Sequence, residues 1–114
     1  MMTLGEIAKK LGFKYLCGEA KAPVPVTGGY ACDLLSDVMA HTKPGDIWVT
    51  RQVHENIVAV ASLKDLAGIV LVNGRAPEEK TIQKAEQEGI ALLLSELPAF
   101  EVVGRLYQEG VRGT

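Results

Sequence analysis

Cysteine is scarce in this chain, which has only 2 cysteines among 114 residues. Aromatic side chains are also few, at 5% of the residues, whereas apolar residues make up 47%. A chain of this length can bury about two-thirds of the surface that it exposes when unfolded. A hydrophobic core can therefore form without disulfide bonds, and the length fits a single domain over residues 1–114.

An excess of basic charge is missing as well. Lysine and arginine number 12, against 14 aspartate and glutamate residues, so the net charge is -2. Proteins that bind the phosphate backbone of DNA or RNA present a strongly positive surface. The composition therefore predicts that nucleic acid is not a partner of this protein.

The chain also lacks a long apolar run. Its longest mostly apolar stretch, Ile57–Leu63, contains Ser62 and is followed by Lys64. A helix that crosses a bilayer needs about 20 apolar residues. At the amino terminus, Glu6 and Lys9 interrupt the apolar pattern, unlike the continuous apolar segment of a secretory signal. We therefore predict no membrane association and a cytoplasmic location.

Closely spaced metal ligands are absent from the sequence. No two of its cysteines and histidines are separated by the few residues that usually lie between paired zinc ligands. The four candidates are Cys17, Cys32, His41 and His54. Alternatively, the cysteines pack in the interior and the histidines lie on loops or helix ends. The sequence predicts no metal site and no cofactor.

Sequence motifs of catalysis are missing too. No Gly-x-x-x-x-Gly-Lys-Ser/Thr or Gly-x-Gly-x-x-Gly string is present, which disfavours a nucleoside-triphosphate hydrolase and a dinucleotide-binding fold. Ser36, Asp37 and His54 are the residue types of a nucleophile triad, but Ser36 lacks the Gly-x-Ser-x-Gly elbow. A small hydrolase that uses these residues is an alternative, and we predict that the protein is not an enzyme.

Helix signals are clear near the amino terminus. Thr3 and Glu6 form a capping box ahead of apolar residues at helical spacing, and Gly12 follows as a stop. Asp33 is placed to cap a second, short helix in which Leu34 faces inward with its apolar neighbours. Between these helices, 13–17 reads as a strand, 18–25 as a loop and 27–30 as a tight turn or bulged strand.

The stretch 56–66 fits either a strand or a helix that is buried on nearly every side. We interpret it as a helix, because Asn56 can cap it and Gly68 follows it where a stop belongs. A helix this apolar must be covered by the sheet and neighbouring helices or by a second subunit, and both alternatives remain open. The apolar carboxy-terminal helix, 98–109, raises the same question.

Three apolar segments recur about every 21 or 22 residues, and a helix follows each of them. The segments are 46–50, 68–72 and 89–93, and the helix after the second begins at Pro77 and stops at Gly89. Such alternation predicts an α/β fold, with a single, mostly parallel sheet of about four to five strands and helices on both faces.

Ligands of open α/β sheets bind beyond the carboxyl ends of the strands. This rule places 50–52, 73–75 and 95–96 along one edge. Glycines 28 and 29 and the turn 73–75 can expose backbone N–H donors to a phosphate group, although the favoured alternative is that these glycines only permit turns with positive φ. The candidate ligand-binding residues are Gly28, Gly29, Asp33, Thr50, Arg51, His54, Asn73, Gly74 and Arg75.

Four segments resemble the DRTGG domain family. They are Thr-Gly-Gly-Tyr-Ala-Cys-Asp-Leu-Leu-Ser-Asp-Val-Met-Ala from position 27, Gly-Asp-Ile-Trp-Val-Thr from 45, Asn-Ile-Val-Ala-Val-Ala from 56 and Ala-Gly-Ile-Val-Leu-Val-Asn-Gly from 67. The first also resembles the amino-terminal domain of HPr kinase/phosphorylase. That enzyme's phosphate-binding loop belongs to its other domain, so the resemblance does not imply a kinase.

The resemblance implies a regulatory, ligand-sensing module, since such domains occur beside CBS domains and on metabolic enzymes, where adenine nucleotides are sensed. The sequence departs from the family at its defining letters. The Asp-Arg pair aligns with Val53-His54 and the Thr-Gly-Gly with Val72-Asn73-Gly74, so only Gly74 is kept. His54 is the substituted position of greatest interest.

These observations predict a non-catalytic regulatory domain, forming a homodimer, that binds an adenine nucleotide or another small anionic ligand. The alternative is an adaptor or dimerisation module that contacts a signalling or metabolic protein and binds no small molecule.

Overall fold

Five strands form one sheet in the order β1-β5-β4-β3-β2 in the computed structural model, which describes residues 1–114. The strands are β1 (Lys14–Cys17), β2 (Gly28–Ala31), β3 (Asp46–Thr50), β4 (Gly68–Leu71) and β5 (Leu92–Leu94). Strands β2, β3, β4 and β5 are parallel, and β1 runs antiparallel to β5 at one edge. The predicted mostly parallel sheet is confirmed.

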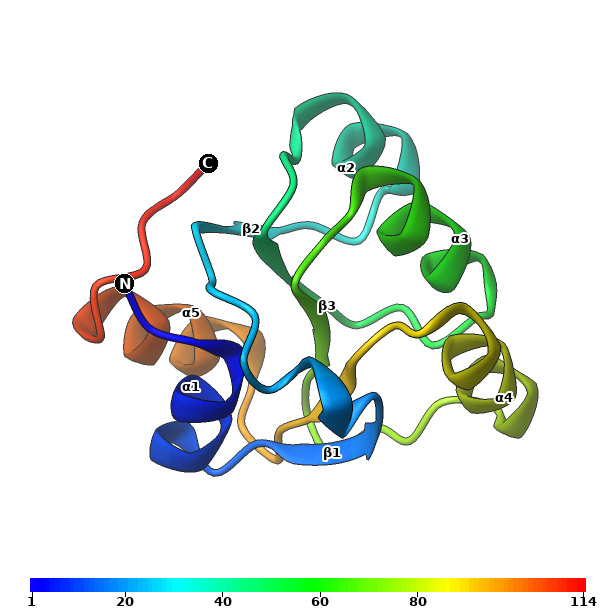
Figure 1. Ribbon diagram of the computed structural model, residues 1–114, viewed down its shortest axis with the longest axis horizontal. Coiled ribbons are helices and arrows are strands. Elements are labelled where there is room, and N and C mark those ends of the chain that lie inside the picture. Colours follow the sequence, from blue (N-terminus) through cyan, green and yellow to red (C-terminus); the bar gives the residue numbers. More distant parts are fainter.

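Helices cover both faces of this sheet, as predicted (Figure 1). Helices α1 (Leu4–Leu11) and α5 (Ala99–Gln108) pack on one face. The other face carries α2 (Leu35–His41), α3 (Asn56–Lys64) and α4 (Glu79–Glu88). A short 3-10 helix, η1 (Glu19–Lys21), lies between β1 and β2. Each face has its own apolar core, because alternate strand residues point to opposite sides.

Local signals set the ends of α1. The Thr3 hydroxyl accepts from the Glu6 N–H at 3.2 Å, and the Glu6 carboxylate accepts from the Thr3 N–H at 2.8 Å. The hydrogen bonds from Thr3 hold the pKa of Glu6 below its ordinary value. Gly12 ends the helix in the left-handed conformation. The predicted capping box is confirmed.

Asp33 does not cap α2. That helix begins after Leu34, whose side chain is 63% exposed instead of facing inward. The Asp33 carboxylate accepts hydrogen bonds from the Thr50 hydroxyl at the end of β3 and from the N–H of Arg51, which directly follows that strand. A long-range partner therefore replaces the local cap that the sequence predicts.

Two further helix boundaries differ from prediction. Asn56 is the first residue of α3 and makes no capping bond, and the helix ends at Asp65, ahead of Gly68, which begins β4. Asp65 adopts φ +54°, a left-handed conformation that aspartate tolerates better than most side chains. Pro77 lies two residues before α4, although Gly89 ends that helix as predicted.

Helix α3 is covered by its own chain. It packs between α2 and α4 and against the sheet (Figure 1). Ile57, Val58, Val60 and Ala61 are buried, and among the large apolar side chains of the helix only Leu63, near its end, is exposed. A second subunit is therefore not needed to cover this helix.

No helix has the length and hydropathy that crossing a bilayer requires.

Candidate functional site

A polar pocket of about 220 Å³ opens at the carboxyl edge of the parallel strands. Its lining comes from the segments that follow three strands: Asp33 after β2, Arg51 and Gln52 after β3, and Arg75 after β4. The strand order brings these segments together, because β2, β3 and β4 are adjacent and parallel. Three of the predicted candidates therefore share one pocket with Gln52.

Asp33 joins the ends of β2 and β3. Its Oδ1 atom accepts from the buried Thr50 hydroxyl and from the Arg51 N–H, each at 2.8 Å. The Gln52 side-chain amide donates to the Asp33 carbonyl at 2.9 Å, and the Gln52 N–H donates to the Thr50 hydroxyl at 3.2 Å. These bonds hold the two loops in one arrangement.

Replacing Asp33 with alanine is expected to lower the free energy of unfolding by about 1–3 kcal/mol, because it removes the acceptor of a buried hydroxyl. Asp33→Asn keeps a side-chain oxygen and should lose less. Urea denaturation measures both changes, and Ser36→Ala, at an exposed position of α2, is the control. An Asp33→Ala protein as stable as the control would contradict this role.

The two arginines of the pocket have no carboxylate partner. Arg51 and Arg75 are exposed, and neither guanidinium group has a nitrogen within 4.0 Å of a carboxylate oxygen. The ion pairs of the structure are Lys10–Glu109, His41–Asp37, Lys84–Glu88 and Arg105–Glu101. A guanidinium group presents several N–H donors in a plane and binds carboxylates and phosphates through two parallel bonds. The pocket therefore offers two unpaired anion-binding groups.

The turn after β4 does not offer free backbone donors. The Asn73 N–H donates to the Leu97 carbonyl at 2.8 Å, and the Gly74 N–H donates to the Ser95 carbonyl at 2.8 Å. Asn73 and Gly74 have φ of +61° and +62°. The expectation of exposed donors at this turn is therefore wrong, and the alternative, a turn that requires positive φ, describes it.

The helix that follows this turn is also a poor anion site. Helix α4 begins with Glu79, directly after Glu78. These carboxylates already satisfy the positive end of the helix dipole and repel a second anion. Any anion binding at this edge therefore depends on the arginine side chains.

Gly28 and Gly29 lie away from the pocket. They begin β2, whereas the pocket forms beyond its last residue. The Gly29 N–H donates to the Arg112 carbonyl at 2.9 Å, and the Thr114 N–H donates to the Gly29 carbonyl at 3.1 Å. These two glycines therefore hold the C-terminal tail against β2 and do not join the other candidates.

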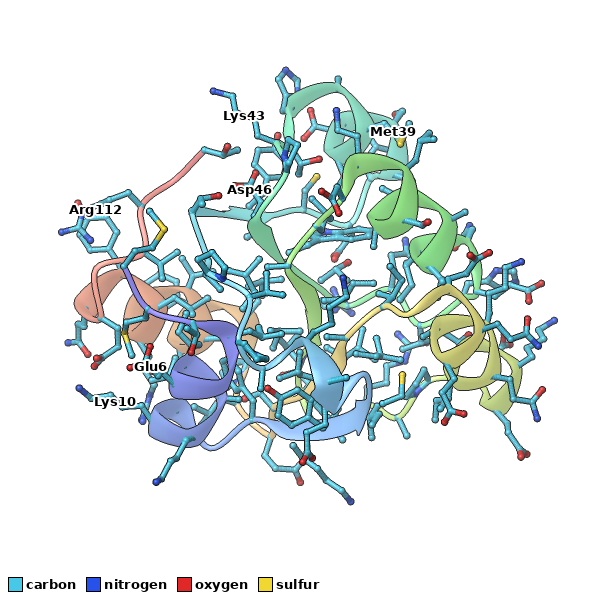
Figure 2. The ribbon with its side chains drawn as sticks, in the orientation of Figure 1. Glu6, Lys10, Met39, Lys43, Asp46 and Arg112 are labelled. Carbon is cyan, nitrogen blue, oxygen red and sulfur yellow. The ribbon has the colours of Figure 1, made fainter.

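A close approach explains why position 28 is a glycine. A Cβ atom there would lie 2.7 Å from Oδ1 of Asp46, a buried carboxylate at the start of β3. The other oxygen of Asp46 accepts from the Lys43 N–H at 2.8 Å, in the turn before the strand (Figure 2). This arrangement is structural.

His54 is exposed between β3 and α3 and does not line the pocket. Its carbonyl accepts from the Ile57 N–H at 3.2 Å, and the neighbouring Val53 carbonyl accepts from the Thr81 hydroxyl of α4 at 2.8 Å.

The pocket residue missing from the predicted candidates is Gln52. Its signal is its place directly after Thr50 and Arg51 at the end of a buried strand.

The residues of the predicted alternative triad are not arranged for catalysis. The Asp37 carboxylate contacts Tyr30 and His41 instead of Ser36. The hydrogen bond to Asp37 raises the pKa of Tyr30 to about 12, and the same bond lowers the pKa of Asp37.

The predicted metal-ligand candidates do not gather at one place. Burial raises the pKa of the Cys17 thiol. No three side chains among His, Cys, Asp and Glu come together as a group that could hold a metal ion.

Comparison with known proteins gives a structural likeness. No protein-family model and no curated protein matches the chain. Among solved structures, the chain is similar to the CBS and DRTGG domains of the regulatory region of Clostridium perfringens pyrophosphatase, solved in complex with the activator diadenosine tetraphosphate. The TM-score is 0.71 at 15% sequence identity.

The match covers 90% of this chain and 45% of the pyrophosphatase chain, so this protein spans less than half the length of that structure. At this level of identity the likeness concerns the fold. It agrees with the resemblance carried by the sequence segments around Asp33, Asp46, Asn56 and Gly68. The chain therefore shares its α/β fold with part of this CBS and DRTGG region.

Proposed function

We propose that this protein is a non-catalytic regulatory domain that binds a small, phosphate-bearing anion in the pocket of Asp33, Arg51, Gln52 and Arg75. The observation that supports this most directly is the pairing of two arginines without carboxylate partners in one polar pocket. The pocket lies at the sheet edge where α/β proteins bind ligands.

The charges of the pocket favour an anion. Two guanidinium groups stand against the single carboxylate of Asp33, whose Oδ1 already accepts bonds from Thr50 and Arg51. Asp33 and Thr50 act as positioning residues, and Arg51 and Arg75 contact the ligand. Asn73 and Gly74 shape the turn from which Arg75 extends.

The size of the pocket indicates how much of a ligand it holds. At about 220 Å³ it is smaller than the roughly 300–1,000 Å³ of pockets that enclose a whole small molecule. A phosphate group therefore enters the pocket, and the rest of the ligand lies on the neighbouring surface. The pyrophosphatase regulatory region was solved with diadenosine tetraphosphate, which supports adenine nucleotides as the first ligands to test.

Thermal unfolding with a panel of adenine and guanine nucleotides, dinucleotides and sugar phosphates tests the proposal. A ligand at a hundred times its dissociation constant adds about 2.7 kcal/mol of stability. For a domain of this size the midpoint should rise by about 4 °C or more. The absence of a shift with every compound would overturn the proposal.

Substitution of the arginines locates the site. Arg51→Ala and Arg75→Ala are each expected to weaken binding by about tenfold or more, because a hydrogen bond to a charged group contributes about 1.5–3 kcal/mol. Isothermal titration calorimetry measures the change. Lys9→Ala, which removes an exposed cation on α1, is the matched control and should bind like the unmodified protein. Equal binding by all three variants would place the ligand elsewhere.

A further inference from the structure

The carboxylate of Asp33 has one oxygen that the protein itself does not use. Its Oδ1 atom accepts from the Thr50 hydroxyl and from the Arg51 N–H, each at 2.8 Å. No hydrogen bond and no ion pair of the structure ends on Oδ2, although Asp33 is exposed and lines the polar pocket. Oδ2 is therefore open to a ligand that enters this pocket.

The donors around Asp33 determine which of its oxygens is left over. The Arg51 N–H is a backbone donor and needs an acceptor opposite it. The Thr50 hydroxyl accepts from the Gln52 N–H at 3.2 Å and donates its single proton to the same Oδ1. Both donors keep an acceptor at the position of Oδ1, so the free position is that of Oδ2.

The pocket therefore makes two demands on an anion. Arg51 and Arg75 supply N–H donors, which bind oxygens that carry negative charge. Asp33 Oδ2 is a charged acceptor, because an ionised carboxylate has no proton to donate. An anion oxygen without a proton is repelled there, whereas a protonated oxygen donates a hydrogen bond. The combination favours an anion that is also a hydrogen-bond donor.

Phosphate groups differ in whether they meet the second demand. A terminal phosphate group loses its last proton with a pKa of about 6, and a nearby negative charge favours the form that keeps this proton. Inorganic hydrogen phosphate also carries a proton. Sulfate has none, and neither do the phosphodiester groups inside a dinucleotide or a nucleic acid. Only the first two can donate to a carboxylate.

We propose that Asp33 Oδ2 determines the specificity of the pocket by accepting a hydrogen bond from a protonated oxygen of a terminal phosphate group. Arg51 and Arg75 bind the other oxygens of that group. The pocket then takes inorganic phosphate and phosphate monoesters and rejects sulfate and phosphodiesters, because selectivity arises from repulsion of the wrong ligand as well as attraction of the right one. This inference rests on the proposed function and names the kind of phosphate group that is bound.

Titration of the isotope-labelled protein with phosphate and with sulfate, followed by NMR, tests this selectivity. In mildly alkaline buffer of constant ionic strength both anions are tetrahedral dianions of similar size, and only hydrogen phosphate carries a proton. The backbone amide signals of Arg51, Gln52 and Arg75 report binding. Phosphate should bind about tenfold more tightly than sulfate or better, because a hydrogen bond to a charged group replaces a repulsion. Methyl phosphate should likewise bind more tightly than dimethyl phosphate.

Asp33→Asn should abolish or reverse the preference for phosphate. The donors of Thr50 and Arg51 hold the asparagine oxygen at the position of Oδ1, which places its amide nitrogen, a donor, at the position of Oδ2. The ratio of the two affinities is the readout, since loss of a negative charge strengthens binding of both anions. Asp65→Asn makes the same chemical change at an exposed position ahead of β4 that does not line the pocket, and it should keep the original ratio.

The possible outcomes separate this inference from the proposed function. Amide signals outside the pocket show whether each variant is folded. Equal binding of phosphate and sulfate by the unmodified protein, or an unchanged ratio in Asp33→Asn, would overturn the role of Asp33 Oδ2 and leave the anion pocket in place. Pocket signals that respond to none of these anions would refute the pocket itself, and the proposed function would fail together with this inference.

Discussion

Replacing Trp48 with alanine is expected to lower the free energy of unfolding by about 3–5 kcal/mol, the range measured for truncating large buried aromatic side chains. Trp48 lies in the middle of β3 and is fully buried in the core beneath α2, α3 and α4. Its indole N–H donates to the Cys32 carbonyl at 2.8 Å. The substitution leaves both a cavity and a carbonyl without this donor.

Circular dichroism during urea denaturation measures this loss, because Trp48 is the only tryptophan and its fluorescence disappears with it. Trp48→Phe keeps most of the packing and loses the hydrogen bond, so it should cost less than alanine and stay folded. Leu63→Ala, at a side chain that is 73% exposed, is the control and should change stability by about 0.5 kcal/mol or less. A loss below about 1 kcal/mol for Trp48→Ala would contradict the described core.

Gly18→Ala is expected to have the second largest effect, a loss of about 3 kcal/mol in the free energy of unfolding. Gly18 has φ +80°, which is unfavourable for any residue with a Cβ atom. The new Cβ atom would also lie 2.4 Å from the Ala91 Cα atom and 2.6 Å from the Ile90 carbonyl oxygen. Both are backbone atoms, so the clash is relieved only by moving β1 away from β5.

Gly89→Ala separates these two contributions. Gly89 has a similar φ of +68°, but a Cβ atom there would meet nothing within 4 Å. This variant should lose only the conformational part, about 1–2 kcal/mol. Thermal or urea unfolding compares the two proteins. Equal losses would show that the close approach of Gly18 to Ala91 contributes nothing.

Sequence reasoning succeeded where the signal and its structural result lie within a few residues of each other. The capping box of Thr3 and Glu6 satisfies backbone groups of the same turn, and Gly89 ends the helix next to it. The helix at 56–64 was harder, because its residues are apolar on nearly all sides. A cap at Asn56 and a stop at Gly68 favoured a helix; the helix forms although neither residue has that role, and packing between α2 and α4 explains why so little of it is polar.

Expectations about individual site residues depended on information that local patterns do not contain. Asp33 looked like a helix cap because its short polar side chain precedes α2, yet Thr50 and Arg51 bind its carboxylate. The donors of Asn73 and Gly74 looked free because the carbonyls of Leu97 and Ser95 that accept them come from a distant loop. In both cases a partner far away in the sequence replaced the local one.

The sequence by itself determined the α/β class, the extent of most helices and strands and the sheet edge that carries the polar strand ends, because apolar periodicity and turn residues act locally. Only the tertiary structure decided which of these residues meet. Strand order and direction place Asp33, Arg51 and Arg75 in one pocket and Gly28 and Gly29 outside it. Those features arise from pairing between residues that are far apart in the chain, which no short pattern encodes.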